Sequence, residues 1–246
     1  MGQLLNLRVY DSIESLVVNL SEAIAFHIIE VLSKQDHFDL VLTGGNTPRP
    51  LFKHLAQNYR DKIPWKKIRF YWSDERYLPQ HDPQSNYGMA KELLLDYVPI
   101  NPDNVFPMPT SFATPAEAAR EYEKTLKSQF DSSVPYFDLA LLGLGEDCHV
   151  ASLFPHQVTL SEKSRWVVAS LSPKKPIQRL SLTFPIINGS RVIYFLVTGD
   201  SKAAPLRRAL SKEHIEIEDC PARGVKPVDG DIVWWLDKAA AKEMGE

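Results

Sequence analysis

Apolar residues recur at helical spacing over residues 11–33. The apolar positions are Ile13, Leu16, Val17, Leu20, Ile24, Ile28 and Val31. A repeat of three to four residues is typical of an amphipathic helix that buries one face. Asp11 and Glu14 have the spacing of a capping box, with Asp in the cap role. The pattern therefore predicts a long helix whose first signal is Asp11.

Short, continuous apolar runs follow this segment and read as strands. The runs FDLVLT (38–43) and FDLALL (137–142) are typical of strands that are buried on both faces of a parallel sheet. Further strands are predicted at residues 68–73, 165–170, 179–183, 191–198 and 232–236. Helices are predicted between them at residues 47–58, 85–94, 115–130, 201–210 and 238–244, with start signals at Thr47, Ser85, Pro115 and Ser201.

This alternation of strands and helices predicts an α/β fold. Alternating elements imply βαβ crossovers, and hence a doubly wound, mostly parallel sheet with helices on both faces. No internal repeat and no long linker interrupts the chain. We therefore expect residues 1–246 to form one domain.

Composition narrows the class of protein. With 44% hydrophobic and 24% charged residues, the chain reads as globular with a sizeable core. A net charge of −3 gives no reason to expect a nucleic-acid partner, and the basic pair Lys174-Lys175 is predicted to be solvated surface. Two cysteines, Cys148 and Cys220, are too few for a disulfide framework and favour a reducing compartment. A single bridge between them stays open.

The sequence also bears on location. The N-terminal stretch lacks the basic start, apolar run and cleavage site of a secretory signal. No apolar run is expected to approach the roughly 20 residues that span a bilayer. We expect a cytoplasmic monomer with no membrane partner.

Candidate chemistry lies where predicted strands end, because ligands of open α/β sheets bind beyond the carboxyl ends of the strands. The first such segment is Gly44-Gly45-Asn46-Thr47, after the strand at 38–43. Glycines let the backbone approach a ligand, and the helix behind them directs free N–H groups and a positive dipole end towards it. This suits a phosphate, although neither a dinucleotide motif nor a Walker lysine is present. A tight turn without a ligand is the alternative.

The second segment is Asp74-Glu75-Arg76, at the end of a buried aromatic run. Charges placed there are costly unless they are paired or bind something. Arg76 offers a planar fork for phosphate oxygens, which makes Asp74 and Arg76 candidate binding residues. An internal salt bridge is the alternative. Asn86, which opens the next helix, is either a further binding residue or only a helix cap.

The third segment, residues 143–149, ends in Asp147-Cys148-His149. A histidine accepts a proton near neutral pH, and a carboxylate two residues away can orient it. We therefore expect His149 and Asp147 to be catalytic. Cys148 is a poor candidate for a nucleophile paired with its neighbour His149, because adjacent side chains usually point apart. A metal site using His149 and His156 is also disfavoured, since no metal-ligand spacing is present.

The fourth segment is Thr198-Gly199-Asp200-Ser201-Lys202. It repeats the strand, glycine and helix-start pattern of the first segment, with Lys202 in the first turn of the predicted helix. A cation is unfavourable near a helix N-terminus unless an anion compensates, and a bound phosphate would do so. A salt bridge from Lys202 to Asp200 is the alternative.

Together these segments resemble the 6-phosphogluconolactonase family. The matching pieces keep their order along almost the whole chain: LTGGNTP (42–48), WSDERYLPQHDPQSNYGMA (72–90), FDLALLGLGEDCHVASLFP (137–155), RLSLTFPIIN (179–188), VIYFLVTGDSKA (192–203) and WWLDKAAA (234–241). The resemblance implies the fold shared with glucosamine-6-phosphate deaminases. It also implies hydrolysis of 6-phosphogluconolactone to 6-phosphogluconate, and the expected partner is therefore a small phosphorylated sugar lactone. The reaction is expected to need neither a metal nor an organic cofactor.

The resemblance also assigns roles to residues. His149 would be the base that activates water, with Asp147 beside it. Arg76 and Lys202 would hold the phosphate, Arg179 would be a further phosphate contact, and the loop Gly44–Thr47 would line the same pocket.

One position departs from the family pattern. Cys148 stands where the family usually has glycine. If that residue needs a positive φ, cysteine costs about 1–2 kcal/mol there, and we expect altered geometry or a slower enzyme.

Two rival functions are weaker on the sequence. Glucosamine-6-phosphate deaminases typically carry Phe-Asn-Glu-Pro after the histidine, whereas this chain has Phe154 in place of that Glu and Arg76 in place of the usual Tyr. The second rival is a non-catalytic sugar-phosphate sensor; regulators built on related folds carry a separate DNA-binding segment, and no helix-turn-helix stretch or basic arm is recognisable in this chain.

Overall fold

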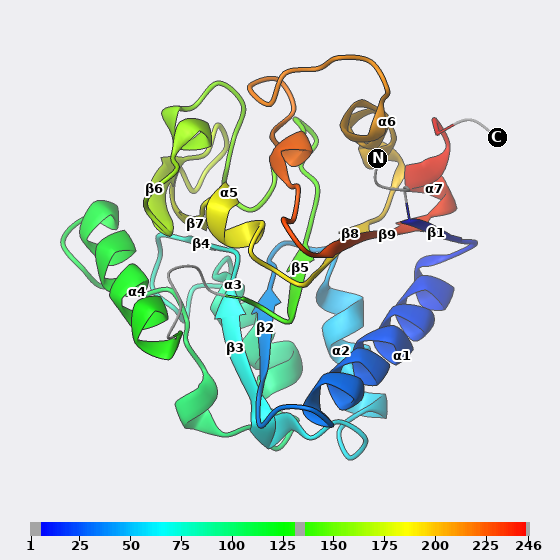
Figure 1. The fold of residues 1–246 in the computed structure, drawn as a ribbon, viewed down its shortest axis with the longest axis vertical. Helices are drawn as coiled ribbons and strands as arrows, with labels where there is room; N and C mark the ends of the chain where they lie inside the picture. The colour runs from blue at the N-terminus through cyan, green and yellow to red at the C-terminus, as the bar shows by residue number, and fades with distance from the viewer. Residues whose placement is uncertain (1–5, 131–135, 245–246) are drawn as a thin grey trace.

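The computed structural model describes residues 6–130 and 136–244, and its centre is a six-stranded parallel sheet. The strand order is β1-β9-β8-β5-β2-β3, and every neighbouring pair is parallel (Figure 1). The strands are β1 (Asn6–Tyr10), β2 (Phe38–Leu42), β3 (Ile68–Trp72), β5 (Leu139–Leu142), β8 (Val192–Val197) and β9 (Asp231–Asp237). The predicted α/β class is confirmed. The sequence missed β1, an edge strand whose residues are exposed or half-buried and so form no buried apolar run.

Helices cover both faces of this sheet. In Figure 1, α1 and α2 lie to the right of β2 and below β8 and β9, whereas α6 lies above β8 and α5 lies above β3. The helices are α1 (Ile13–Leu32), α2 (Arg49–Asn58), α3 (Asn86–Ala90), α4 (Pro115–Gln129), α5 (Phe184–Ile187), α6 (Ala203–Leu210) and α7 (Lys238–Ala241). A π-helical turn, Lys91–Leu95, extends α3 to about the end predicted for it, whereas α7 is shorter than predicted. Short 3-10 turns lie at Trp65–Lys67, Pro102–Asn104, Val158–Ser161, Asp200–Lys202 and Pro221–Gly224.

A second, three-stranded antiparallel sheet lies beside the first, and the sequence did not predict it. Its order is β4 (Asp74–Arg76), β7 (Gln178–Leu182), β6 (Val167–Leu171). Only Ser73 separates β3 from β4, so the chain leaves one sheet and enters the other at the end of the aromatic run. All three residues of β4 are charged, so the sequence has no apolar run there that would predict a strand. Pairing with β7 creates β4, and it sets Arg76 opposite Arg179.

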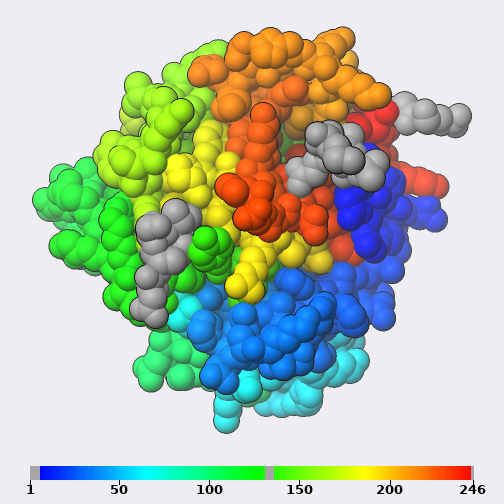
Figure 2. Space-filling model, in the orientation of Figure 1, coloured from blue at the N-terminus to red at the C-terminus, as the bar shows by residue number. Residues whose placement is uncertain are grey.

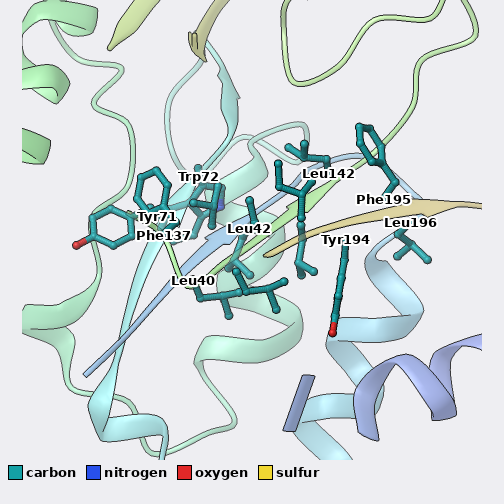
Figure 3. Packing of buried hydrophobic residues seen from close by; sticks show 14 of the residues in the cluster. Leu40, Leu42, Tyr71, Trp72, Phe137, Leu142, Tyr194, Phe195 and Leu196 are labelled. Carbon is teal, nitrogen blue, oxygen red and sulfur yellow. The ribbon is translucent and has the colours of Figure 1, made fainter. Parts of the chain in front are cut away.

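The core lies between the large sheet and its helices. All five residues of β2 are buried, as expected for a central strand covered on both faces. Figure 3 shows Leu40 and Leu42 among the buried side chains of the sheet, and Leu42 pairs in register with Trp72 of β3. Aromatic rings extend the core at one side, where Tyr71 lies 5.2 Å from Phe137 between ring centroids.

Three predicted helix caps are wrong. Ser12, not Asp11, caps α1: its hydroxyl accepts from the backbone N–H of Ser15, while the Asp11 carboxylate pairs with Lys238. Thr47 does not cap α2, which starts after Pro48, and Ser201 lies inside a 3-10 turn before α6. Ser85 does cap α3 as predicted. Neighbouring Ser, Thr and Asp residues can all serve as caps, and the path of the chain selects among them.

Helix α1 corrects the expectation that no apolar run has membrane-spanning length. Its 20 residues have a mean hydropathy of 1.6 over the best window, which is long and apolar enough for a span by composition alone. However, Leu16, Leu20, Ile24 and Ile28 lie buried on one face of this helix. The same face is the core face that the periodicity predicted.

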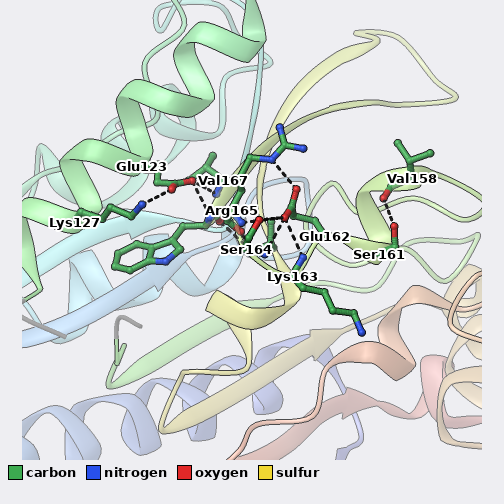
Figure 4. Close-up of polar contacts among 11 residues, drawn as sticks. Glu123, Lys127, Val158, Ser161, Glu162, Lys163, Ser164, Arg165 and Val167 are labelled. Carbon is green, nitrogen blue, oxygen red and sulfur yellow. Dashed lines mark hydrogen bonds and ion pairs between the residues drawn. The ribbon is translucent and has the colours of Figure 1, made fainter. Parts of the chain in front are cut away.

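Polar contacts tie α4 to the segment that precedes β6 (Figure 4). Glu123 accepts from the backbone N–H of Trp166 at 2.8 Å and pairs with Lys127 at 2.6 Å. Glu162 closes the adjoining turn. It accepts from the backbone N–H groups of Arg165 and Ser164.

Glu162 supplies a pH-dependent part of the stability. Hydrogen bonds from the backbone N–H groups of Arg165 and Ser164 hold the pKa of this carboxyl well below its usual value. The ionised form therefore stabilises the fold above the unfolded pKa of 4.5, and the contribution is lost as pH falls through the lower folded pKa. We expect Glu162→Gln to lower Tm by roughly 2–4 °C at pH 7 and by less at pH 3. Calorimetry at both pH values, with the exposed Glu92→Gln as control, measures this; an equal loss at both would contradict it.

Candidate functional site

The candidate functional site lies where four neighbouring strands end. The strands β8, β5, β2 and β3 are adjacent and parallel, so their carboxyl ends lie along one edge of the sheet. The chain order reverses beside β2, and such a switch point is where open sheets bind ligands. A cavity of about 880 Å³ lies there. It is lined by all eleven residues singled out from the sequence: Gly44, Gly45, Asn46, Thr47, Asp74, Arg76, Asn86, Asp147, His149, Arg179 and Lys202.

The glycine loop after β2 is required by close packing. A Cβ on Gly44 would lie 1.8 Å from Asn86 Oδ1, so only glycine lets the two segments meet. Gly45 has φ +86°, a left-handed conformation that favours glycine. The loop is therefore a tight turn, and it also forms a wall of the cavity.

Two arginines face the same part of the cavity from the small sheet. Arg76 makes no ion pair with Asp74 or Glu75 in the part of the chain that the structure describes, so the salt-bridge alternative is wrong. Its Nη1 donates to the carbonyl oxygen of Gln84 at 2.6 Å, and its buried Nε has no partner among the described residues. Arg179 lies opposite in the β4–β7 register. Burial lowers the pKa of Arg179, and the charge of Arg76 lowers it further. Cations held this close favour a bound anion.

The carboxylates of Asp74 and Glu75 are occupied by hydrogen bonds within the protein. Asp74 accepts from Ser152 Oγ at 2.7 Å, although it lines the cavity. Glu75 is 1% exposed and accepts from the backbone N–H groups of Arg76, Asn86 and Tyr87. Burial raises the pKa of Glu75. These acids hold the cavity wall in place and make no ion pair with Arg76 or Arg179 among the described residues, although their charges partly oppose the lowering of the Arg179 pKa.

Asn86 is a wall residue rather than a helix cap. Ser85 caps the helix, so the cap alternative for Asn86 is wrong. The Asn86 Nδ2 group donates to the carbonyl oxygen of Asp74 at 2.8 Å. Its Oδ1 is buried and has no hydrogen-bond partner among the described residues. A buried amide oxygen without a partner can accept a hydrogen bond from a ligand bound in the cavity.

The histidine and the carboxylate two residues before it form a pair. His149 Nδ1 lies 2.5 Å from Asp147 Oδ1, which also accepts from the backbone N–H of His149. Burial alone would raise the pKa of Asp147, but the hydrogen bonds and charge of His149 outweigh it and leave that pKa lowered. The ring of Phe154 packs at 4.5 Å from the imidazole. Because Nδ1 is held by the carboxylate, Nε2 is the nitrogen available to a ligand or water.

Lys202 supplies a third cation. Asp200 pairs with Lys242 at 2.8 Å, so the predicted alternative of a Lys202–Asp200 bridge is wrong. Burial lowers the pKa of Lys202, while the charges of Glu146 and Asp147 oppose this change. Lys202 therefore faces the cavity beside the His149–Asp147 pair.

The sequence reasoning missed some residues of the cavity wall. Lys174, predicted to be solvated surface, lines the cavity and binds Glu146 at 3.1 Å. Ser152 and Phe154 follow the histidine and also line the cavity. Lys174 lies in the turn between β6 and β7, and it reaches the cavity by binding Glu146, a residue 28 positions earlier in the chain. A contact between such distant residues leaves no local motif in the sequence.

The other histidine of this region lies apart from the pair. His156 pairs with Asp219 at 3.5 Å, on the loop before Cys220. Over residues 6–130 and 136–244, no group of three or more His, Cys, Asp or Glu side chains could hold a metal ion.

The fold and the site define an α/β protein in which the cationic side chains of Arg76, Arg179 and Lys202 and a histidine–carboxylate pair line one cavity. Residues 11–234 match the family of glucosamine-6-phosphate isomerases and 6-phosphogluconolactonases. The chain belongs to this family.

Individual relatives are similar over nearly the whole chain. A 6-phosphogluconolactonase from Synechocystis is 39% identical over 88% of this chain and 89% of its own length. The solved structure of 6-phosphogluconolactonase from Trypanosoma brucei has a TM-score of 0.88 at 29% identity, over 99% of this chain and 100% of that one. A monomeric glucosamine-6-phosphate deaminase, with a TM-score of 0.81 at 22% identity over 97% of this chain and 100% of that one, shares the fold.

Proposed function

We propose that this chain hydrolyses 6-phospho-D-glucono-1,5-lactone to 6-phospho-D-gluconate. The observation that carries the proposal is one cavity in which Arg76, Arg179 and Lys202 lie with the His149–Asp147 pair. Relatives named 6-phosphogluconolactonase support the choice of substrate. The reaction is proposed to use neither a metal nor an organic cofactor, and to take place in the cytoplasm.

His149 is the proposed general base. Asp147 holds Nδ1, so Nε2 takes a proton from water as the water oxygen attacks the lactone carbonyl carbon. The tetrahedral intermediate then collapses, the bond from the carbonyl carbon to the ring oxygen breaks, and the imidazolium returns the proton to that oxygen. A δ-lactone is an activated ester, so no covalent enzyme intermediate is needed.

The cations are proposed to hold the phosphate. Arg76 and Lys202 bind its oxygens, Arg179 adds charge, and the loop Gly44–Thr47 closes the pocket. The phosphate is carried on C6, outside the ring, and takes no part in the bond changes at the C1 carbonyl, so binding it fixes the ring against the base. Interactions with a remote group of this kind hold the reacting atoms in position.

A coupled assay tests the function. Freshly prepared 6-phosphogluconolactone is mixed with the protein, and 6-phosphogluconate is measured with its dehydrogenase, after correction for spontaneous hydrolysis. We expect hydrolysis well above that background and no ammonia from glucosamine 6-phosphate. Ammonia release would indicate a deaminase instead. Binding of 6-phosphogluconate without any faster lactone opening would indicate a sensor.

Arg76→Ala tests the phosphate contact. We expect KM to rise about 10- to 100-fold with a smaller change in kcat, because a charge-assisted fork to the phosphate is lost, and the phosphate does not take part in the reaction at the carbonyl. Initial rates over a range of lactone concentrations separate the two constants. Arg60→Ala is the control, since Arg60 is exposed and pairs with Asp61 outside the cavity. An unchanged KM would remove Arg76 from the phosphate site.

A further inference from the structure

A disulfide reaches into the proposed catalytic loop. Cys148, which lies between Asp147 and His149, is bonded to Cys220, 72 residues later, with a Cα–Cα distance of 4.8 Å. This is the single bridge that the sequence left open. It joins the loop after β5 to the segment that precedes the turn Pro221–Gly224.

The bridged residue has a conformation that cysteine does not favour. Cys148 has φ +70°, in the left-handed region that glycine adopts readily. The family pattern with glycine at this position is thereby explained. Because residue 148 connects the carboxylate to the imidazole, its φ sets the direction in which His149 leaves the loop.

Two backbone hydrogen bonds lie within this loop. The Cys148 N–H donates to the carbonyl oxygen of Gly145 at 3.1 Å, and the Gly145 N–H donates to that of His149 at 2.9 Å. Outside the loop, the backbone of Cys148 is tied by one hydrogen bond, from the N–H of Ala222 to its carbonyl oxygen at 3.0 Å. Both of these external ties, the hydrogen bond and the disulfide, come from the segment Cys220–Ala222.

We propose that the Cys148–Cys220 disulfide is a redox-controlled positioning device for His149, an inference that rests on the proposed function. In the oxidised chain, the bond keeps residue 148 left-handed and the imidazole aligned with Asp147. When a dithiol reduces the bond, Cys148 relaxes towards negative φ and His149 loses its alignment. Turnover then falls.

The chemistry is thiol–disulfide exchange. A thiolate of the dithiol attacks the Cys220 sulfur, the bond between the two protein sulfurs breaks, and Cys148 leaves as a thiolate that takes up a proton. The second thiol of the reductant then displaces Cys220. Two electrons pass to the protein, which ends with two thiols, while the reductant ends as a disulfide.

The approach to the bond lies through an exposed loop. Both cysteines are 0% exposed, so the reductant needs an opening. Residues 211–219 are exposed or half-buried and end at Cys220. In Figure 2, the orange chain of this region forms the upper rim of the molecule. The loop is tied by the backbone N–H of His156 to the carbonyl oxygen of Glu218 and by the His156–Asp219 pair. Loosening these ties uncovers Cys220.

The device acts on the base and leaves the two arginines of the proposed phosphate site in place. Arg76 and Arg179 lie on β4 and β7, which the disulfide does not touch. Reduction should therefore lower kcat and leave KM nearly unchanged. A disulfide that only stabilised the fold would change Tm and leave kcat unaltered at temperatures where both forms are folded.

The test compares oxidised and dithiothreitol-treated protein. Thiol titration after denaturation should find none before and two after treatment. We expect reduction to lower kcat about tenfold and to change KM less than about twofold. A tenfold loss of rate corresponds to the free-energy cost of holding one residue in the left-handed conformation. Imidazole NMR signals of His149 should shift on reduction. This second readout stays informative if the lactone is not the substrate.

Two variants at the same position separate conformation from covalent bonding. Neither Cys148→Gly nor Cys148→Ala can form the bridge, so neither should respond to dithiothreitol. Glycine keeps the left-handed conformation and alanine does not, so kcat of the glycine variant should be about fivefold or more above that of the alanine variant.

Equal kcat values for the oxidised and reduced wild type, or for the two variants, would overturn the proposal. Two free thiols before treatment would do so as well. Absence of lactonase activity in every form, with the NMR shift present, would sink the proposed function alone.

Discussion

His149→Ala should lower kcat for lactone hydrolysis by about 10²- to 10⁴-fold, the range that general-base catalysis supplies. The variant removes the proton acceptor, while the three cations of the cavity remain. KM should therefore change little. The imidazole is half-exposed, and its partners are a partly exposed carboxylate and one ring. We expect the fold to survive the substitution, which circular dichroism and a thermal melt would check.

The measurement needs a matched histidine. His156→Ala removes an imidazole that is 71% exposed and pairs with Asp219 outside the cavity. Its kcat should stay within about twofold of the wild type, since surface substitutions have small effects. Both variants are assayed on fresh lactone against the spontaneous rate. If His149→Ala matches His156→Ala, His149 is not the base.

Gly145→Ala should lower kcat by about 100-fold, because a shift of the base by an ångström has an effect of this size. A Cβ on Gly145 would lie 2.0 Å from His149 Nδ1, the nitrogen that Asp147 holds. The backbone of Gly145 does not have a positive φ, so alanine is tolerated by the main chain itself. The added methyl group must displace the imidazole and break the histidine–carboxylate pair.

Gly143→Ala is the matched control for this variant. A Cβ there has its nearest neighbour at 4.0 Å, Thr43 Oγ1, so the methyl group fits. We expect kcat of this control to fall by far less, within about threefold of the wild type. Steady-state kinetics of both variants, with histidine NMR to follow the ring, measure the difference. A fully active Gly145→Ala would show that the contact between Gly145 and the imidazole does not position the base.

The sequence determined five of the six strands of the large sheet and the segments where the candidate site residues lie. Continuous apolar runs such as 38–42 are buried on both faces, and this is a local property of composition. The segments after these strands meet at one edge because parallel strands share their direction. The meeting of Gly44, Arg76, His149 and Lys202 was therefore predictable before any tertiary contact was known.

Only the tertiary structure decided the features that depend on distant partners. The strand β4 exists because β7 pairs with it, and Lys174 lines the cavity because a turn brings it to Glu146. The helix caps at Ser12 and Pro48 depend on the path of the chain, since several nearby residues could serve. The disulfide joins residues 72 apart, and spacing along a chain does not determine such a pairing. Local patterns encode burial and periodicity, whereas pairing between distant segments is fixed only when the whole chain packs.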